Sequence, residues 1–278
     1  MDRVLSTVVS WGKVLVERGV LVRAISRGFA VLSAISRDGP ITLMEISRGA
    51  DVPYATACRV VQTLMHEGLI ERESGRKKYR VTALVQSLAT GFQQEDLLAA
   101  KARPQMEALC QKVGWPISLA TRVGTRMMVR ASTHKMTSLT FTNYFPGFTL
   151  PISECATGKA YLAYCDEEER NMIGDAFEAT DSEAAQTGML LLSDGVALQN
   201  IRETGYALQS RNLYNFEPGK TSSLAVPVMD IENKLIGSMA LIYFASAIKP
   251  NEAAEEFVPA MRETAKLISK EVGVSEFQ

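Results

Sequence analysis

The spacing of hydrophobic residues predicts three short helices near the start of the chain. From residue 23 the apolar positions recur every three or four residues, the period of one helix face, until glycine and proline stop the run at 38–40. Thr42 and Glu45 have the spacing of a reciprocal N-terminal cap, so a second, short helix begins there. Pro53 suits the first turn of a third helix, where its missing amide costs nothing.

The third predicted helix ends at Gly68 and separates a hydrophobic face from a small, polar and basic one. Its apolar residues recur at i, i+3, i+4 and i+7 and leave Arg59 on the outside. A short helix, a tight turn and such a second helix are typical of a helix-turn-helix that reads the major groove of DNA, although any packing of three helices has the same period. The predicted DNA contacts on these helices are Thr42, Tyr54, Ala55, Thr56 and Arg59.

A basic hairpin is predicted directly after these helices. Two short strand-like segments, 69–72 and 79–81, flank a glycine turn that carries Arg76, Lys77 and Lys78 in succession. Three cations at a hairpin tip suit contact with DNA phosphates, whereas the alternative is a solvated basic turn. With the helices upstream, the pattern favours a winged helix-turn-helix whose partner is a double-stranded DNA operator.

The charges divide along the chain in the way this interpretation requires. Residues 1–92 carry 13 Lys and Arg against 8 Asp and Glu, while residues 93–278 carry 17 against 23, so a basic first third precedes an acidic remainder. Chance gives differences of this size, but the asymmetry agrees with a polyanion-binding module joined to a different domain.

The rest of the chain alternates between helical and strand-like patterns. Apolar residues from Leu84 to Val113 predict one or two connecting helices, with flexion at Gly91 and an apolar surface suited to dimerisation. Strands, then helices, then strands again indicate an α+β sheet domain. The predicted strands are 117–123, 127–132, 139–142, 206–213, 222–229 and 235–245, and the predicted helices follow Pro151, span 194–204 and span 251–273.

Several motifs, in order along the chain, resemble the IclR family of bacterial transcription regulators from Arg23 to about Val272. The matching segments are 23–28, 45–47, 53–59, 64, 67–70, 150–152, 156–163, 205–207 and 224–228. Further segments resemble family members that activate genes in response to hydroxyphenylpropionate and related aromatic acids: 113–116, 129–130, 133–134, 139–141 and 242–247.

The resemblance implies the fold and the partners. We expect an α+β protein in which an N-terminal winged helix-turn-helix is joined by a helical linker to a GAF-like α/β domain that binds a small aromatic carboxylate effector. The resemblance also implies a homodimer or homotetramer. The expected divisions are an N-terminal extension at 1–22, the DNA-binding domain at 23–82, the linker at 83–113 and the effector-binding domain at 114–278.

A predicted helix start marks the expected effector site. Small residues at 153–159 open a helix after a strand-like segment, and the free amides and dipole of such a start attract anions. The alternative is that small residues only let the helix approach the sheet, and the family resemblance favours the ligand. The residues expected at this start are Cys155, Ala156, Thr157 and Gly158.

Polar residues on apolar strands are expected across the pocket, because buried hydroxyls need partners that a ligand can supply. Arg211 stands near a position that is acidic in many family members, so it suits bidentate capture of a carboxylate, unless it is an ordinary surface arginine. His134 and Tyr144 are candidates for recognising a ring or a hydroxyl. The other expected contacts are Asn212, Ser222, Ser223 and Ser238.

Composition excludes most other classes of protein. The 278 residues are 46% hydrophobic and 22% charged, which is typical of globular domains, and charged residues interrupt the apolar segment 4–22, so we expect a cytoplasmic protein without a membrane span. Four separated cysteines and two histidines form no metal motif or catalytic triad, so we expect no metal, no cofactor and no enzyme. The alternatives are redox sensing by Cys155 or Cys165, or an enzyme with Cys155 as nucleophile.

Overall fold

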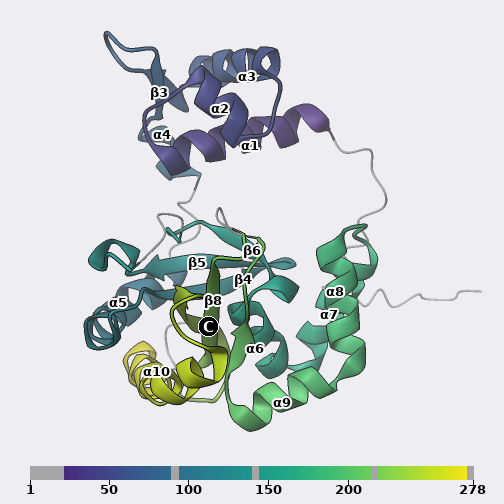
Figure 1. Ribbon diagram of the computed structural model, residues 1–278. Helices are drawn as coiled ribbons and strands as arrows, with labels where there is room; N and C mark the ends of the chain where they lie inside the picture. The colour runs from purple at the N-terminus through teal and green to yellow at the C-terminus, as the bar shows by residue number, and fades with distance from the viewer. Residues whose placement is uncertain (1–21, 89–93, 140–143, 215–217, 274–278) are drawn as a thin grey trace, which may run out of the picture. The chain divides into compact units, whose positions relative to one another are not determined.

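The computed structural model describes residues 22–88, 94–139, 144–214 and 218–273. The chain divides into two compact units, Met1–Gln93 and Gln94–Gln278, both of which appear in Figure 1. Gly91 and most of the strand expected at 139–142 lie outside the described residues. Each unit is built around its own hydrophobic core.

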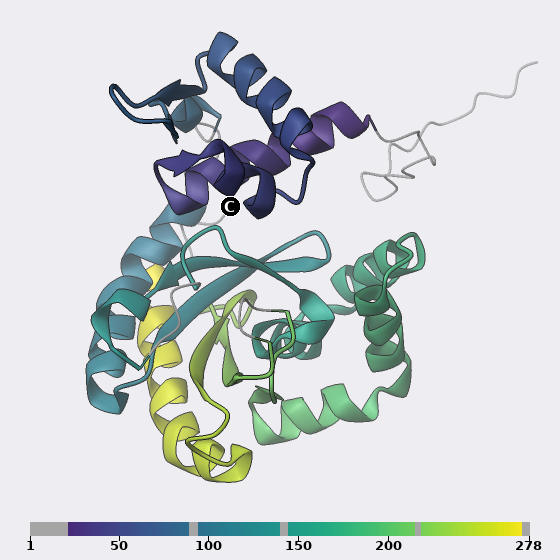
Figure 2. The ribbon, with the colours of Figure 1, turned by 45° about the horizontal axis from the view of Figure 1, so that its top comes forward.

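The first unit is a three-helix cluster with a small antiparallel sheet (Figure 2). All three predicted helices and both strands of the predicted hairpin are present. The core lies between the helices and includes Val31, Ile35, Ile46, Val61 and Leu64. The elements are α1 (Arg23–Asp38), β1 (Ile41–Thr42), α2 (Leu43–Gly49), α3 (Tyr54–His66), β2 (Ile70–Arg72), β3 (Lys78–Val81) and α4 (Leu84–Ser87), with strand order β1-β3-β2.

The capping box predicted at the start of α2 is confirmed. The Thr42 amide donates to Glu45 Oε2 at 2.7 Å, and the Glu45 amide donates to Thr42 Oγ1 at 3.4 Å. These bonds satisfy two amides that a helix start leaves without intrahelical acceptors. Thr42 also pairs with Lys78 of β3, so the cap joins the helix-turn-helix to the hairpin.

The second unit contains a six-stranded antiparallel sheet with order β6-β5-β4-β9-β8-β7. Helices α5 and α10 cover one face, while α6 packs on the other face with α9 beside it. The strands are β4 (Ile117–Val123), β5 (Arg126–Ser132), β6 (Thr149–Pro151), β7 (Ala207–Gln209), β8 (Thr221–Met229) and β9 (Leu235–Phe244). The helices are α5 (Gln94–Val113), α6 (Ala156–Tyr164), α7 (Glu167–Glu178), α8 (Glu183–Asp194), α9 (Val196–Thr204) and α10 (Pro250–Val272), with 3₁₀ turns at His134–Met136 and Ile152–Glu154.

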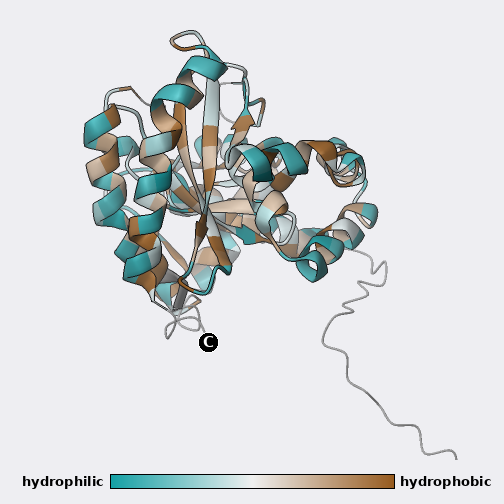
Figure 3. Cartoon of the chain, turned by 90° about the horizontal axis from the view of Figure 1, so that it is seen from below, coloured by the Kyte–Doolittle hydropathy of each residue, from teal (hydrophilic) through white to brown (hydrophobic). Residues whose placement is uncertain are grey.

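Successive side chains of the central strands point to opposite faces of the sheet and pack into two separate cores. On β9, Met239, Leu241 and Tyr243 point to the core under α5 and α10, whereas Ala240 and Ile242 point to the side of α6. Figure 3 shows mostly hydrophobic strands between helices that alternate hydrophilic and hydrophobic faces. Burial on both faces explains why β8 from Leu224 onward and most of β9 are apolar.

The second unit differs from the sequence prediction in several places. Helices α7 and α8 and the short strand β6 were not predicted. Strand β7 is shorter than the predicted 206–213, because Arg211 has a φ of 45° and the chain turns there, with the Asn212 amide donating to the Thr221 carbonyl at 2.8 Å. Helix α5, expected as part of a linker, packs against α10 within the second unit.

Candidate functional site

The outer face of α3 is free of the packing that fixes its inner face. Ala57, Val61 and Leu64 are buried in the core, while Tyr54 and Arg59 are exposed, as are Ala55, Gln62 and Thr63; Thr56 is half-buried. Among the residues that the structure describes, no hydrogen bond or ion pair holds the Arg59 guanidinium. This face therefore leaves hydrogen-bond donors and acceptors exposed to solvent, and the prediction that it points outward is confirmed. The Thr42 hydroxyl is already used in the cap of α2.

The hairpin after α3 carries exposed cations at its turn. Strands β2 and β3 pair from Ile70 with Val81 to Arg72 with Tyr79, and Arg76 and Lys77 are exposed between them, while Lys78 is half-buried at the start of β3. Arg80 is held by Glu71, with 2.6 Å between Nη2 and Oε1. The hairpin thus has the form of a wing with exposed cations at its tip.

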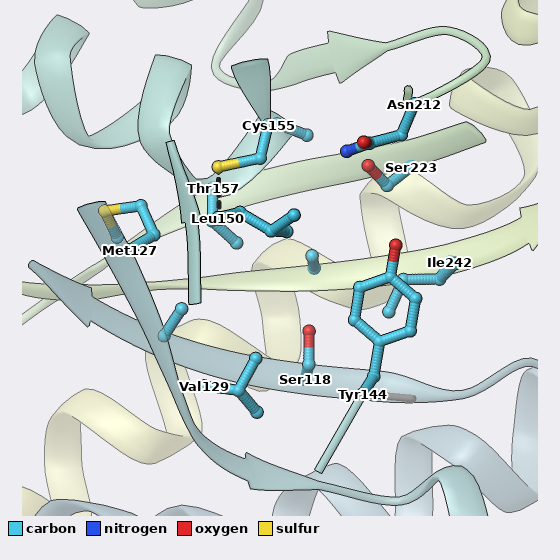
Figure 4. Close-up of a pocket in the computed structure, with 13 residues that line it drawn as sticks. Ser118, Met127, Val129, Tyr144, Leu150, Cys155, Thr157, Asn212, Ser223 and Ile242 are labelled. Carbon is cyan, nitrogen blue, oxygen red and sulfur yellow. Dashed lines mark hydrogen bonds between the residues drawn. The ribbon is translucent and has the colours of Figure 1, made fainter. Parts of the chain in front are cut away.

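A small cavity lies between the sheet and the N-terminus of α6 (Figure 4). Its accessible volume is about 20 Å³, which is room for about one water molecule. An organic ligand therefore needs movement of the lining side chains to enter. The lining residues are Ser118, Ala120, Met127, Val129, Tyr144, Leu150, Cys155, Ala156, Thr157, Asn212, Ser223, Ala240 and Ile242.

Five of the residues predicted for effector binding meet at this cavity: Cys155, Ala156, Thr157, Asn212 and Ser223. Tyr144, also named from the sequence, points its ring into it from the opposite side. The apolar walls and Ser118 were not predicted from the sequence. Apolar side chains on a sheet carry no chemical signal of a ligand, so only the fold identifies them.

The structure places the other five predicted residues outside the cavity. Gly158 lies one position further into α6, and Ser222 points to the opposite face of the sheet and accepts from the Arg211 amide at 3.1 Å. Ser238 shares the sheet face of Ala240 but lies next to the cavity; its hydroxyl is buried and has no hydrogen-bond partner among the described residues.

Arg211 and His134 also lie outside the cavity, and each contacts other residues. Arg211 is exposed, and its Nη1 donates to the Gly219 carbonyl at 3.3 Å. His134 lies in a 3₁₀ turn with Nδ1 3.3 Å from Ser132 Oγ, and burial together with the nearby Lys135 lowers its pKa. The polar groups available to a ligand are therefore those at the α6 start and on the strands, without a guanidinium.

The α6 start holds its own side chains in place. The Gly158 amide donates to Cys155 Sγ at 3.4 Å, and the thiol lies 3.3 Å from Thr157 Oγ1. Asn212 is buried; its Nδ2 donates to the Glu154 carbonyl at 3.2 Å, and its Oδ1 accepts from the Tyr214 amide at 2.7 Å. The cavity is thus bordered by preorganised dipoles at a helix N-terminus, a suitable environment for an anion.

The thiols of Cys155, at the cavity, and Cys165, at the C-terminal end of α6, are protonated at neutral pH. Burial raises the pKa of Cys155 and outweighs the opposing effects of Thr157 and the Gly158 amide, and burial raises the pKa of Cys165 to about 11. Since the thiolate is the reactive form, neither sulfur is prepared for nucleophilic attack or oxidation. This environment argues against both cysteine-based alternatives.

We expect the native protein to show one accessible thiol. At pH 8, Cys58 on α3 is half-exposed and should react with Ellman's reagent, whereas Cys110, Cys155 and Cys165 are buried and should react at least about tenfold more slowly. Denaturant should then release the three remaining thiols. Rapid native reaction at Cys155, located by mass spectrometry, would instead support a redox sensor.

Comparisons with known proteins agree with both units. The IclR helix-turn-helix domain matches residues 24–74, and the C-terminal domain of the bacterial transcriptional regulator IclR matches residues 92–270. None of the described helices is both long and apolar enough to cross a membrane.

Individual relatives are distant regulators. The chain is 27% identical over 155 residues to the HTH-type transcriptional regulator TsaQ1/TsaQ2 of Comamonas testosteroni, and this match spans 55% of each chain. It is 25% identical over 224 residues to the regulator BhcR of Paracoccus denitrificans, covering 79% of this chain and 77% of the relative.

A solved structure shows the same fold along nearly the whole chain. It is an IclR homolog from Microbacterium hydrocarbonoxydans complexed with 4-hydroxybenzoate, with a TM-score of 0.62 and 21% identity over 90% of this chain and 98% of that one. The matched domains belong to ligand-responsive regulators rather than enzymes. The chain belongs to the IclR family of bacterial transcriptional regulators.

Proposed function

We propose that this regulator senses a small aromatic carboxylate in the cavity beside α6 and activates an operon for the breakdown of aromatic acids. The observation that carries the proposal is the composition of the cavity. Met127, Val129 and Ile242 form apolar walls for a ring, and Thr157 and Asn212 stand with the α6 amides at one end. An apolar cavity with a few convergent polar groups is the usual form of a small-molecule site.

The carboxylate would lie against the N-terminus of α6. The Gly158 amide donates to Cys155 Sγ, but the Ala156 and Thr157 amides at the helix start have no intrahelical acceptor, and the helix dipole favours negative charge there, so no arginine is required. Ser118 and Ser223, which also line the cavity, would then bind a hydroxyl group on the ring. The Microbacterium homolog with bound 4-hydroxybenzoate is a precedent for a ligand of this class in this fold.

The DNA-binding unit would act in pairs. We propose a homodimer or homotetramer in which α3 of each protomer reads one operator half-site and the wing contacts phosphates. The effector controls transcription only if it binds the DNA-competent arrangement with a different affinity from the incompetent one. Activation, rather than repression, rests on the resemblance to activators that respond to hydroxyphenylpropionate.

A thermal-shift measurement tests the effector class. Benzoate, 4-hydroxybenzoate and 3-(3-hydroxyphenyl)propionate are added to the purified full chain, with benzyl alcohol as the neutral control. A ligand that binds only the folded protein stabilises it by about 2.7 kcal/mol at a concentration of one hundred times its Kd, so its melting temperature rises. We expect a saturable rise for at least one acid and none for the alcohol.

Substitution locates the site. Ile242→Trp fills the cavity and should abolish the rise, whereas Arg211→Ala, at an exposed position that does not line the cavity, should retain it. Equal stabilisation by benzyl alcohol would contradict an anionic effector. Loss of the response in Arg211→Ala would show that Arg211 binds the carboxylate, as the sequence predicted.

A further inference from the structure

A groove separate from the cavity also borders the first turn of α6. It runs between α6, the 3₁₀ turn before it and α8, and it is open to solvent. Its accessible volume is about 340 Å³, at the lower end of the range for small-molecule sites. Its lining contains a cation from Lys159, a carboxylate from Asp194, apolar surface from Leu190 and Leu191, and the polar residues Ser153, Thr187 and Ser193.

Lys159 brings a partly buried charge to the groove. It is half-buried, and within the described ranges its ammonium makes no hydrogen bond or ion pair. Burial lowers the pKa of the Lys159 ammonium, although the Glu154 carboxylate acts in the opposite direction. Partial desolvation of a charge is costly unless a counter-charge compensates, so the Lys159 ammonium favours an incoming anion, against the opposing negative charges of Glu154 and Asp194.

The apolar side of the groove is also unusual. Leu190 is 70% exposed, and it lines the groove with Leu191 next to it on α8. The Ser153 hydroxyl, at the base, is committed to the Ala184 carbonyl at 2.7 Å, so it braces α8 against the turn before α6. An ammonium beside aliphatic side chains matches a ligand with an anionic head and a short apolar body.

We propose that this groove is a second ligand site, which takes a small monocarboxylate with its head on Lys159 and its apolar body on Leu190 and Leu191. The two sites share one helix. Thr157 lines the first cavity and Lys159 lines the groove, two residues apart on α6. Occupancy of either site then acts on the same helical turn, and any coupling between the two affinities is reciprocal.

Methyl NMR distinguishes the two sites in the full chain. Leucine and methionine methyl groups are labelled, sodium butyrate is the probe, and sodium chloride is the control for ionic strength. Met127 reports on the first cavity, whereas Leu190 and Leu191 report on the groove. We expect saturable shifts at both leucines, with a saturation curve separate from any shift at Met127.

Two variants test the role of the cation. Lys159→Met removes the ammonium and keeps an unbranched side chain that is one atom shorter. It should weaken the response of Leu190 and Leu191 at least tenfold while leaving the melting temperature without ligand the same or higher, because a poorly compensated charge is removed. Lys266→Met makes the same change in net charge at an exposed site on α10 and should bind butyrate as the wild type does.

A third variant keeps the proposal testable if Lys159→Met does not fold. Leu190→Glu places a negative charge at an exposed position of the groove and should also weaken butyrate binding. The proposal is overturned if the leucine signals stay unshifted by butyrate, or if a folded Lys159→Met or Leu190→Glu variant saturates as the wild type does. A shift at Met127 alone would leave the first cavity as an effector site and remove the groove.

Discussion

Replacing Gly158 by alanine is expected to lower the free energy of unfolding of the second unit by about 3 kcal/mol or more. A Cβ atom at this position would overlap the carbonyl group and Cα of Ile152. The obstacle is backbone rather than a movable side chain, so the turn Ile152–Glu154 and α6 would have to separate. Gly158 thus permits the close approach that positions Cys155 and Thr157 at the cavity.

Chemical denaturation followed by the fluorescence of Trp115, which lies in the core of the second unit, measures the effect. Gly174→Ala is the matched control, because this helical glycine on α7 has only Leu192 Cδ1 near the added Cβ, at 3.6 Å. Alanine there should stabilise the protein by up to about 1 kcal/mol through helix propensity. A Gly158→Ala variant that unfolds like the wild type would show that the α6 start adjusts freely.

The first unit was predictable because its signals are local. Helix α1 ends at the glycine and proline after Asp38, the capping box of Thr42 and Glu45 begins α2, and the alternation of buried and outward positions orients α3. Each signal operates within a few residues along the chain. Strand β1 escaped prediction because two residues, Ile41 and Thr42, have no periodicity of their own and are defined by pairing with β3.

The second unit was predictable mainly in its central strands. Strand β4 matches its predicted bounds, and the predicted ends of β8 and β9 differ by at most one residue, because long β-branched and apolar segments have few alternatives. Helices α7 and α8 did have local signals in their caps, Asp166 and Ser182, which accept from the Glu169 and Ala185 amides.

The effector site was predictable at the helix start and less so on the strands. Cys155 and Thr157 follow from the motif itself. Ser222 and Ser223 are adjacent and chemically identical, and only the register of β8 decides which faces α6. The position of Arg211 was not predictable, because its side chain leaves the strand at a turn with a positive φ, and no periodic pattern in the sequence specifies that turn.

Replacing Arg59 by alanine is expected to weaken operator binding by about 1–3 kcal/mol, or about 5- to 150-fold in Kd, if its guanidinium contacts a base. The side chain is exposed on the outer face of α3, and removing it leaves the buried residues Ala57 and Val61 unchanged. Fluorescence anisotropy with operator DNA, and with every single substitution of one half-site, should show lost preference at one base pair.

The wing supplies the matched control, since Lys77 is also exposed and also cationic. Lys77→Ala should weaken binding to operator and unrelated DNA alike and reduce the slope of log K against log salt concentration by about 1, because a phosphate contact carries no sequence information. If Arg59 recognises a base, Arg59→Ala must change the DNA sequence preference while the free energy of unfolding of the protein stays the same. If Arg59→Ala instead behaved as Lys77→Ala does, Arg59 would be a phosphate contact, and if it bound operator as tightly as the wild type, the outer face of α3 would not be the surface that reads DNA.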